Sequence, residues 1–338
     1  MTPKERYLNT LQGKPCDCLP RVPILMQFAA EYIGSNYGAF AADYRILAEA
    51  NYRCAKDFDF DQLSAISDPY RETAGFGGIT TFVEDGVPRC SGPLEGDDDI
   101  DVSKLPRPDP LQCDRMRDRI EGVREMHRLA GETHSIMGWV EGPAAEAADL
   151  RGLSNFFMDL LDDKEGVDAL MERTTDNAIH FAHAQIEAGA DTVGIGEAMA
   201  SQVSAETYAE LILPYTDRLV RAIRERGAFV KLHVCGNITH LLPHFRTMPI
   251  NILDLDHLVD TSTARQLIGP GITLCTNLDP SGLVCHGNPE TIRAAVLKAV
   301  SRLGNPCMIN AGCEIPSGTP EENLRALCTP VPWKPNPA

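Results

Sequence analysis

The sequence predicts an α/β fold, a single (β/α)8 TIM barrel in which eight parallel strands close into a ring. Three observations support this class. Short apolar runs alternate with longer amphipathic stretches along the chain. The 338 residues exceed the roughly 250 that such a barrel needs, which leaves room for insertions. Polar side chains recur directly after the apolar runs, where a barrel carries its functional groups. We therefore predict one domain over residues 1–338.

The first part of the chain is expected to contain two strands and two additions to the barrel. Residues 3–11 predict a short helix, an N-terminal helical extension. The first strand is expected at 22–26, a helix follows at 39–56, and the second strand is expected at 62–66. The stretch 79–90 alternates in polarity and contains an Asp-Gly pair, which predicts a β-hairpin insertion after the second strand.

The remaining chain continues the alternation of strands and helices. Residues 96–110 are acidic and rich in proline, which indicates an exposed loop. Helices are expected at 113–130 and 204–225, and the second of these is the clearest amphipathic crossover. The other six strands are expected where short apolar runs occur, at 135–141, 191–195, 229–234, 250–254, 272–275 and 307–310.

Composition and charge exclude several classes of protein. The net charge of −17 argues against a nucleic-acid partner or an anionic membrane. No run approaches the roughly 18 apolar residues that cross a bilayer, and the first residues lack the apolar stretch of a signal peptide. The 11 cysteines are odd in number and include no Cys-x-x-Cys pair, which favours reduced thiols. We expect a cytoplasmic protein, and the cysteine usage hints at an anaerobe.

The most informative motif is His233-Val234-Cys235, at the end of an expected strand. Strand side chains alternate between faces, so the imidazole and the thiol point the same way. With Cys313, after the last expected strand, they would supply three zinc ligands and leave a fourth position open, as in catalytic zinc sites. The alternative is a chance pair in which the cysteine is a small buried hydrophobe. The position of both cysteines at strand ends beside glycine turns favours zinc.

Other polar residues are expected at the same end of the barrel. Glu141 and Glu197 are candidates for a fourth metal ligand, a proton donor or a substrate contact. The alternative for each is a carboxylate that caps the following helix. Asn277, Asp279 and Asn310 follow neighbouring strands, and we predict that they contact a cofactor there.

Three segments carry a resemblance to a known family, and they are residues 232–242, 276–280 and 312–324. Together they resemble the uroporphyrinogen decarboxylase superfamily, and more narrowly its cobalamin-dependent methyltransferase branch, over nearly the whole chain. The resemblance implies a TIM barrel that transfers a methyl group between a corrinoid and a small molecule. It also implies that Zn2+ is held by the histidine, the cysteine two residues on and the late cysteine, which are His233, Cys235 and Cys313.

The resemblance further implies the substrates and the partner. The small molecule would be a methoxylated aromatic, a methylamine-type compound, a thiol such as coenzyme M, or a folate, so the chain would serve one-carbon metabolism, by O-demethylation for example. Methylcobalamin or another corrinoid would arrive on a separate corrinoid protein that docks transiently. The chain itself lacks the Asp-x-His-x-x-Gly segment that ligates cobalt in such proteins. The direction of transfer and a homodimer are left open.

Two functions other than methyl transfer are considered. The first is a tetrapyrrole decarboxylase, because Asp68 in Ser-Asp-Pro resembles the catalytic aspartate of the decarboxylases. Those enzymes have arginines just after the first strand, whereas this chain has Gln27 and Glu31, and a glutamate repels a carboxylated substrate. The second alternative is a non-catalytic protein that binds zinc or a corrinoid.

Overall fold

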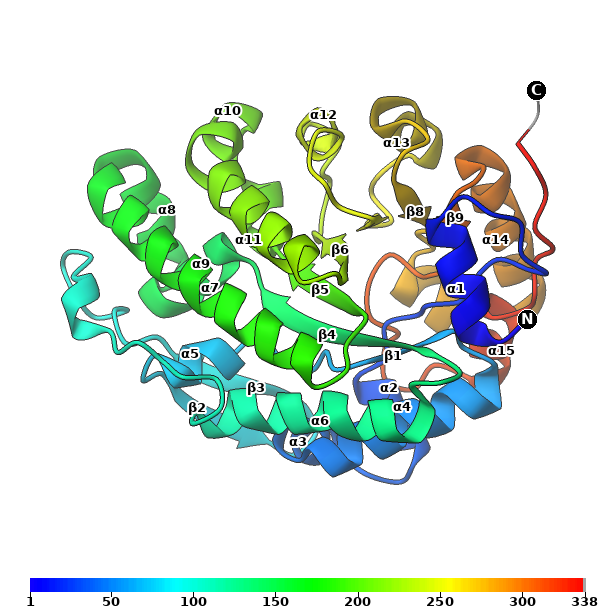
Figure 1. Ribbon diagram of the computed structural model, residues 1–338, viewed down its shortest axis with the longest axis horizontal. Helices are drawn as coiled ribbons and strands as arrows, with labels where there is room; N and C mark the ends of the chain where they lie inside the picture. Colours follow the sequence, from blue (N-terminus) through cyan, green and yellow to red (C-terminus); the bar gives the residue numbers. More distant parts are fainter. Residues whose placement is uncertain (337–338) are drawn as a thin grey trace.

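A curled parallel sheet forms the centre of the molecule, and helices cover its outer face (Figure 1). The structure is a computed structural model that describes residues 1–336. The seven strands pair in the order β1-β4-β5-β6-β7-β8-β9. Their bounds are β1 Gln62–Ser64, β4 Ser135–Glu141, β5 Thr192–Gly196, β6 Phe229–His233, β7 Ile252–Asp254, β8 Thr273–Cys275 and β9 Cys307–Met308.

The ring closes through a segment that is not a regular strand, which corrects the expected count of eight. Segment 20–24 lies between β9 and β1. The backbone N–H of Val22 donates to the carbonyl of Ile309 at 2.8 Å, and Asp61 N–H donates to the carbonyl of Arg21 at 2.9 Å. Two of the five residues in this segment are prolines, which lack the N–H that a continuous ladder needs. The segment therefore pairs only at isolated points, with two backbone hydrogen bonds to Ile309 and one to Asp61, and still joins the two edges.

Fifteen α-helices surround the sheet within residues 1–336. They are α1 Pro3–Leu11, α2 Gln27–Tyr32, α3 Tyr37–Ala42, α4 Tyr44–Phe58, α5 Arg71–Gly75, α6 Asp114–Ala130, α7 Pro143–Arg151, α8 Leu153–Asp162, α9 Lys164–Glu187, α10 Ala205–Thr207, α11 Leu213–Glu225, α12 Leu242–Phe245, α13 Thr261–Ile268, α14 Pro289–Leu303 and α15 Glu321–Leu327. No helix among the described residues is long and apolar enough to cross a membrane.

Two expected helices are interrupted in the structure. The expected helix 39–56 is divided at Asp43, whose extended backbone ends α3 and whose carboxylate accepts from Arg45 N–H to cap α4. The expected helix 204–225 contains the π-helical turn Tyr208–Ile212 just before Pro214. Proline cannot donate to the preceding turn, and a π-turn is one way for a helix to continue past it.

Both additions to the barrel are confirmed. Helix α1 begins with a capping box between Thr2 and Glu5. The hairpin consists of β2 (Ile79–Val83) and β3 (Gly86–Ser91), which pair antiparallel. The expected α/β barrel class is confirmed with them.

Helix α1 covers the amino end of the barrel. Tyr7 of α1 is fully buried, and its hydroxyl lies 3.0 Å from Thr192 Oγ1 and 2.9 Å from Gln62 Nε2. Both partners are the first residues of their strands. The tyrosine also packs in an apolar cluster with Ile252 and Met308. The carboxyl ends of the strands, opposite α1, are left for the functional groups.

Candidate metal centre

Three side chains that could bind a metal converge at the carboxyl end of β6. His233 is the last residue of β6, Cys235 lies two residues beyond, and Cys313 comes from the loop after β9. His233 Nε2 lies 3.3 Å from Cys235 Sγ and 3.8 Å from Cys313 Sγ, and the two sulfurs are 3.9 Å apart. Within the described residues this is the one group of three or more such side chains close enough to share an ion.

Two glycines let the loops that carry the cysteines approach their neighbours. Gly236 has a φ of +89°, and its N–H donates to Asp256 Oδ2 at 2.9 Å. A Cβ atom at Gly312 would come within 2.6 Å of the backbone nitrogen of His257. Only glycine allows this approach, which holds the Cys313 loop against the loop that follows β7.

Buried polar residues hold the ring of His233 from behind. Nδ1 of His233 lies 3.2 Å from Oδ2 of Asp254, at the end of β7. The same oxygen lies 2.9 Å from Lys231 Nζ, and Asn310 Nδ2 donates to Oδ1 at 3.1 Å. The Nδ1–H of the ring therefore donates to the carboxylate, and Nε2 is the nitrogen that faces the sulfurs. A carboxylate behind a histidine is the usual way to fix the tautomer of a metal ligand.

Lys231 was not anticipated from the sequence. It is almost fully buried inside the barrel, and Asp254 is its ion-pair partner. The available signal was a lysine within the apolar run 229–234, two residues before His233 and therefore on the same face of the strand.

Contacts among the three candidate ligands shift their pKa values in opposite directions. The hydrogen bond from Cys235 lowers the pKa of Cys313 despite its burial, and His233 lowers it further. The same hydrogen bond, together with burial, raises the pKa of Cys235. Burial lowers the pKa of His233, but its contacts with Asp254 and Cys313 outweigh this and raise the pKa to about 9. The arrangement is thus a thiolate beside a thiol and an imidazolium.

The donor atoms fit a zinc ion. One imidazole nitrogen and two sulfurs are typical ligands of zinc, whereas calcium and magnesium prefer oxygen. Three protein donors leave one position for a further ligand, which is typical of catalytic zinc sites.

A cavity of about 420 Å³ opens beside Cys235 at the carboxyl end of the barrel. Its walls come from the loops after β1, β5 and β6 and from helix α7. Glu141, the last residue of β4, also lines it. The carboxylate accepts from Arg71 Nη2 at 2.9 Å and from Trp139 Nε1 at 3.0 Å, both through Oε1. A small molecule in this cavity would touch Cys235 and Glu141 together.

The other two predicted catalytic carboxylates are engaged elsewhere in the protein. Glu197 is 1% exposed and accepts from the N–H of Ala145 at 2.8 Å, in the first turn of α7. Glu197 therefore caps a helix, but the helix is α7, which precedes it in the chain, and not the following helix that the alternative expected. Asp68 is 2% exposed and forms a two-point ion pair with Arg115, at 2.8 and 2.7 Å. Neither residue lines the cavity beside Cys235.

The three predicted cofactor-contacting residues also bond within the protein. Asn277 donates to the carbonyl oxygens of Asp256 and Val259, at 2.8 and 2.7 Å. Asp279 accepts from the backbone at the start of the π-helical turn Pro280–Cys285. Asn310 is fully buried and bonds to Asp254, behind the metal cluster. None of the three lines the cavity beside Cys235, and their contact with a cofactor stays a prediction.

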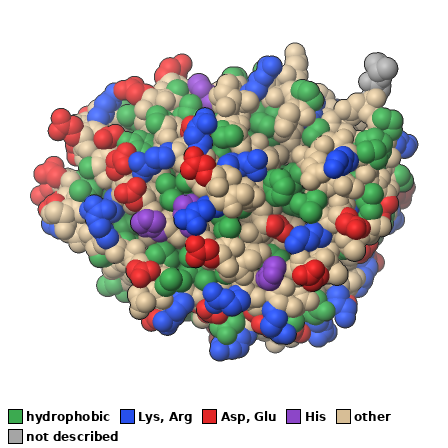
Figure 2. Space-filling view, in the orientation of Figure 1, with side chains coloured by type: hydrophobic (Ala, Val, Ile, Leu, Met, Phe, Trp, Pro, Cys, Tyr) green, Lys and Arg blue, Asp and Glu red, His purple; other side chains and the backbone are tan. Residues whose placement is uncertain are grey.

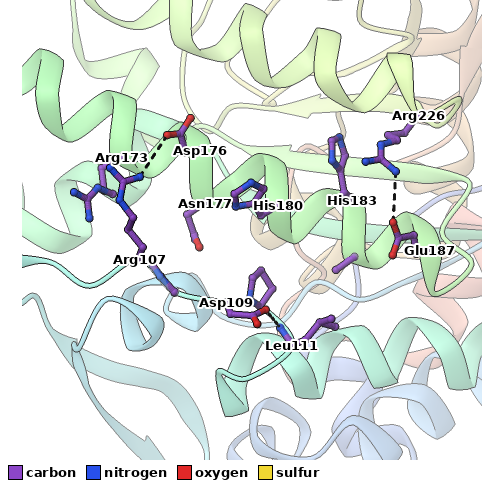
Figure 3. A pocket seen from close by; sticks show the side chains of 13 residues that line it. Arg107, Asp109, Leu111, Arg173, Asp176, Asn177, His180, His183, Glu187 and Arg226 are labelled. Carbon is purple, nitrogen blue, oxygen red and sulfur yellow. Dashed lines mark hydrogen bonds and ion pairs between the residues drawn. The ribbon is translucent and has the colours of Figure 1, made fainter.

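A second cavity, of about 440 Å³, is a groove on the outside of the barrel (Figure 3). It lies between α9 and the loop before α6. Its charged groups pair with one another, as in Arg226 with Glu187 at 3.5 Å and Arg107 with Asp176 at 4.0 Å. The surrounding face mixes acidic and basic side chains (Figure 2). The groove contains none of the three candidate ligands, so the functional site is assigned to the barrel mouth.

Comparison with known proteins gives a consistent relationship. The uroporphyrinogen decarboxylase (URO-D) family model matches residues 2–331. A methylcobamide:CoM methyltransferase MtbA of Methanosarcina mazei is 28% identical over 334 residues, covering 96% of both chains. A uroporphyrinogen decarboxylase of Microcystis aeruginosa is 23% identical, covering 96% of this chain and 95% of its own. A solved methyltransferase from Methanosarcina mazei shares the fold, with a TM-score of 0.85, 20% identity and 97% coverage of both chains.

Proposed function

Because the chain belongs to the uroporphyrinogen decarboxylase family, we propose that it is a zinc-dependent, corrinoid-dependent methyltransferase. It moves a methyl group between a corrinoid on a separate protein and a small molecule. The observation that carries the proposal is the convergence of His233, Cys235 and Cys313 beside a cavity at the barrel mouth. The full-length similarity to methylcobamide:CoM methyltransferases supports it.

We assign zinc binding to Nε2 of His233 and to the sulfurs of Cys235 and Cys313. A zinc ion there would act as a Lewis acid, which lowers the pKa of a bound thiol or polarises an ether or amine. Asp254 orients the imidazole by accepting from Nδ1–H, and Lys231 and Asn310 orient Asp254. The protein thus sets the nitrogen that faces the ion before any ligand arrives.

Glu141 is the candidate proton donor or substrate contact. Burial raises the pKa of its carboxyl, and Glu72 and Asp149 add to the rise against the opposing effect of Arg71. The raised pKa favours the protonated form of the carboxyl, which can donate a hydrogen bond into the cavity. We propose that Glu197, which caps α7 instead, is a structural residue.

The decarboxylase alternative is disfavoured by charge. Asp68 is already neutralised by Arg115. Glu31 accepts from Ser317 and from Gly318 N–H, in the loop that follows Cys313. Its carboxylate adds negative charge near the place where a polycarboxylated tetrapyrrole would have to enter, and such a substrate would be repelled.

The corrinoid protein is expected to dock over the carboxyl ends of the strands, because the cobalt must reach an atom bound beside Cys235. The contact must be transient, since the carrier leaves to be methylated or reduced elsewhere, and such interfaces are small. A homodimer and a cytoplasmic location stay predictions from the sequence.

Metal analysis and methyl transfer test the proposal together. The purified chain should contain about one zinc ion and should transfer methyl groups only with corrinoid protein or excess free cobalamin. Cys235→Ala and Cys313→Ala should each lose most of the zinc and the activity. Cys90→Ala, which removes a partly exposed thiol of the hairpin, is the matched control and should retain both.

Two results would contradict the proposal separately. Stoichiometric zinc in the Cys235→Ala/Cys313→Ala double variant would refute the ligand assignment. A zinc-loaded chain that transfers no methyl group with any of the four substrate classes would refute the function.

A further inference from the structure

The cavity beside Cys235 combines apolar walls with carboxylates. Pro69, Leu153 and Met199 contribute apolar surface, and Glu141 and Asp149 contribute the two acidic groups. No Lys, Arg or His lines the cavity among the residues that the structure describes. This distribution bears on which molecules can enter the site proposed above.

Asp149 is a carboxylate without a partner in the described structure. It lies on α7 and is half-buried, and it forms no side-chain hydrogen bond or ion pair with any residue from 1 to 336. Burial, with a smaller contribution from Glu72, raises the pKa of Asp149 to about 7. A half-buried acid of this kind is stabilised by a ligand that donates a hydrogen bond or carries a positive charge.

Two arginines that contact residues at or beside the cavity wall are already paired with acids. Arg71 is fully buried and contacts Glu141 at 2.9 Å and Glu72 at 3.5 Å. Arg115 is held by both oxygens of Asp68. Two cysteine thiolates would offset the charge of a zinc ion held beside Cys235. An anion elsewhere in the cavity would therefore be desolvated beside two acids with no unpaired cation to receive it, which is unfavourable.

We propose that this cavity binds the uncharged or cationic part of a small, largely apolar substrate, and that Asp149 accepts a hydrogen bond from its polar head. The cavity selects against sulfonate and carboxylate groups. This inference rests on the proposed function, since it names the substrate class of the same site. It makes Asp149 a specificity-determining residue.

Three thiols of equal chain length test the charge preference. They share the group HS–CH2–CH2 and end in a sulfonate (coenzyme M), a hydroxyl (2-mercaptoethanol) or an ammonium (cysteamine). Each is titrated by calorimetry into the zinc-loaded full chain, and each is assayed as methyl acceptor with excess methylcobalamin. The Kd of the hydroxyl and ammonium thiols should be about tenfold or more lower than that of the sulfonate thiol. Their kcat/KM should be higher by about the same factor.

Substitution of Asp149 separates its role from that of the cavity as a whole. In Asp149→Asn, the kcat/KM for cysteamine divided by the kcat/KM for coenzyme M should fall by about fivefold or more, because one of the two acids is removed. Glu225→Gln, at the far end of α11, makes the same change in net charge on an exposed side chain and should leave the ratio unchanged. The ratio compares two ligands on one protein, so it does not depend on the amount of folded protein.

The outcomes distinguish this inference from the proposed function. Preference for coenzyme M with methyl transfer intact would overturn the inference and leave the function standing. The expected binding order without methyl transfer to any thiol would support the inference and refute transfer to thiols. Failure of all three thiols to bind, or an unchanged ratio in Asp149→Asn, would overturn the inference.

Discussion

Nδ1 of His233 and Oδ2 of Asp254 lie 3.2 Å apart at the ends of adjacent strands, β6 and β7. The pair is in register in the sheet, so the strand pairing itself sets the separation of the two side chains. This contact leaves Nε2 as the nitrogen that faces Cys235 and Cys313. The sheet therefore orients the first candidate ligand before a metal binds.

Loss of this contact should weaken zinc binding. In the double variant Lys231→Met/Asp254→Leu the two buried charges and the acceptor of His233 Nδ1–H are removed together, so no buried charge is left unpaired and the fold should be retained. The zinc affinity should fall about 10-fold to 100-fold, the usual effect of losing the group that orients a metal ligand. Competition with a chromophoric zinc chelator measures the change, and an affinity equal to that of the unmodified chain would show that Asp254 does not position His233.

The single variant Lys231→Met should be less stable than the double variant. It leaves the almost fully buried carboxylate of Asp254 with His233 as its remaining charged partner. Loss of the lysine should cost up to about 3 kcal/mol of unfolding free energy. Urea denaturation of the single and double variants gives the comparison. Equal stabilities of the two variants would mean that the carboxylate of Asp254 carries no cost when Lys231 is absent.

Zinc affinity should rise with pH through the neutral range. His233 has a pKa raised to about 9, mainly by Asp254 against the effect of burial, and the pKa of Cys235 is raised by its hydrogen bond to Cys313 and by burial. Both groups hold protons at pH 7, and a cation must displace them. Calorimetry in buffers of different ionisation enthalpy should detect release of about two protons, and Cys235→Ala, where residual binding permits, should release fewer. Binding without proton release would contradict these protonation states.

Glu197→Gln should remove a pH dependence of stability. Burial raises the pKa of Glu197 to about 7 in the folded protein, from 4.5 for an unperturbed carboxyl. The folded state therefore holds the proton more tightly, so this group's contribution is complete below about pH 4.5 and is lost as pH rises to about 7. The loss is at most about 1.4 kcal/mol per pH unit in that window. Urea denaturation at pH 5 and pH 8 should show a smaller difference for Glu197→Gln, whereas Glu225→Gln should match the unmodified chain.

The chain should not decarboxylate uroporphyrinogen. The resemblance to the family implies that Gln27 and Glu31 replace arginines of the decarboxylases, and Glu31 accepts a hydrogen bond from Gly318 N–H in the loop after Cys313. The assay measures release of carbon dioxide from uroporphyrinogen under reducing conditions. Turnover of about 1 per second or faster, an ordinary enzymatic rate, would reverse the choice between the two branches of the family.

Much of the fold follows from local signals in the sequence. Strand β4 begins and ends where its apolar run predicts, at Ser135 and Glu141, and the Asp-Gly pair predicts the hairpin. The sequence was misleading where proline removes a backbone donor. Pro23 lies in an apolar run that pairs only at isolated points, and Pro214 interrupts a long amphipathic stretch.

The site was predictable only in part. The period of two along a strand places His233 and Cys235 on one face, and closure of a barrel brings the late Cys313 within reach. The roles of carboxylates at strand ends depend on side-chain direction, which a sequence does not encode locally. Glu141 and Glu197 both end or follow a strand, yet one lines the cavity and the other caps a helix.

Tyr7 is buried among the first residues of the strands and closes the amino end of the barrel, so the barrel is open only at its carboxyl end. No molecule can pass through the centre of the barrel, so the small molecule and the corrinoid must both reach the site from the carboxyl end. If the corrinoid carrier docks over that entrance as proposed, it imposes an order on the catalytic cycle. The small molecule would then bind first, and its product would leave only after the carrier departs. Steady-state kinetics should therefore show an ordered sequential pattern, in which excess carrier slows product release.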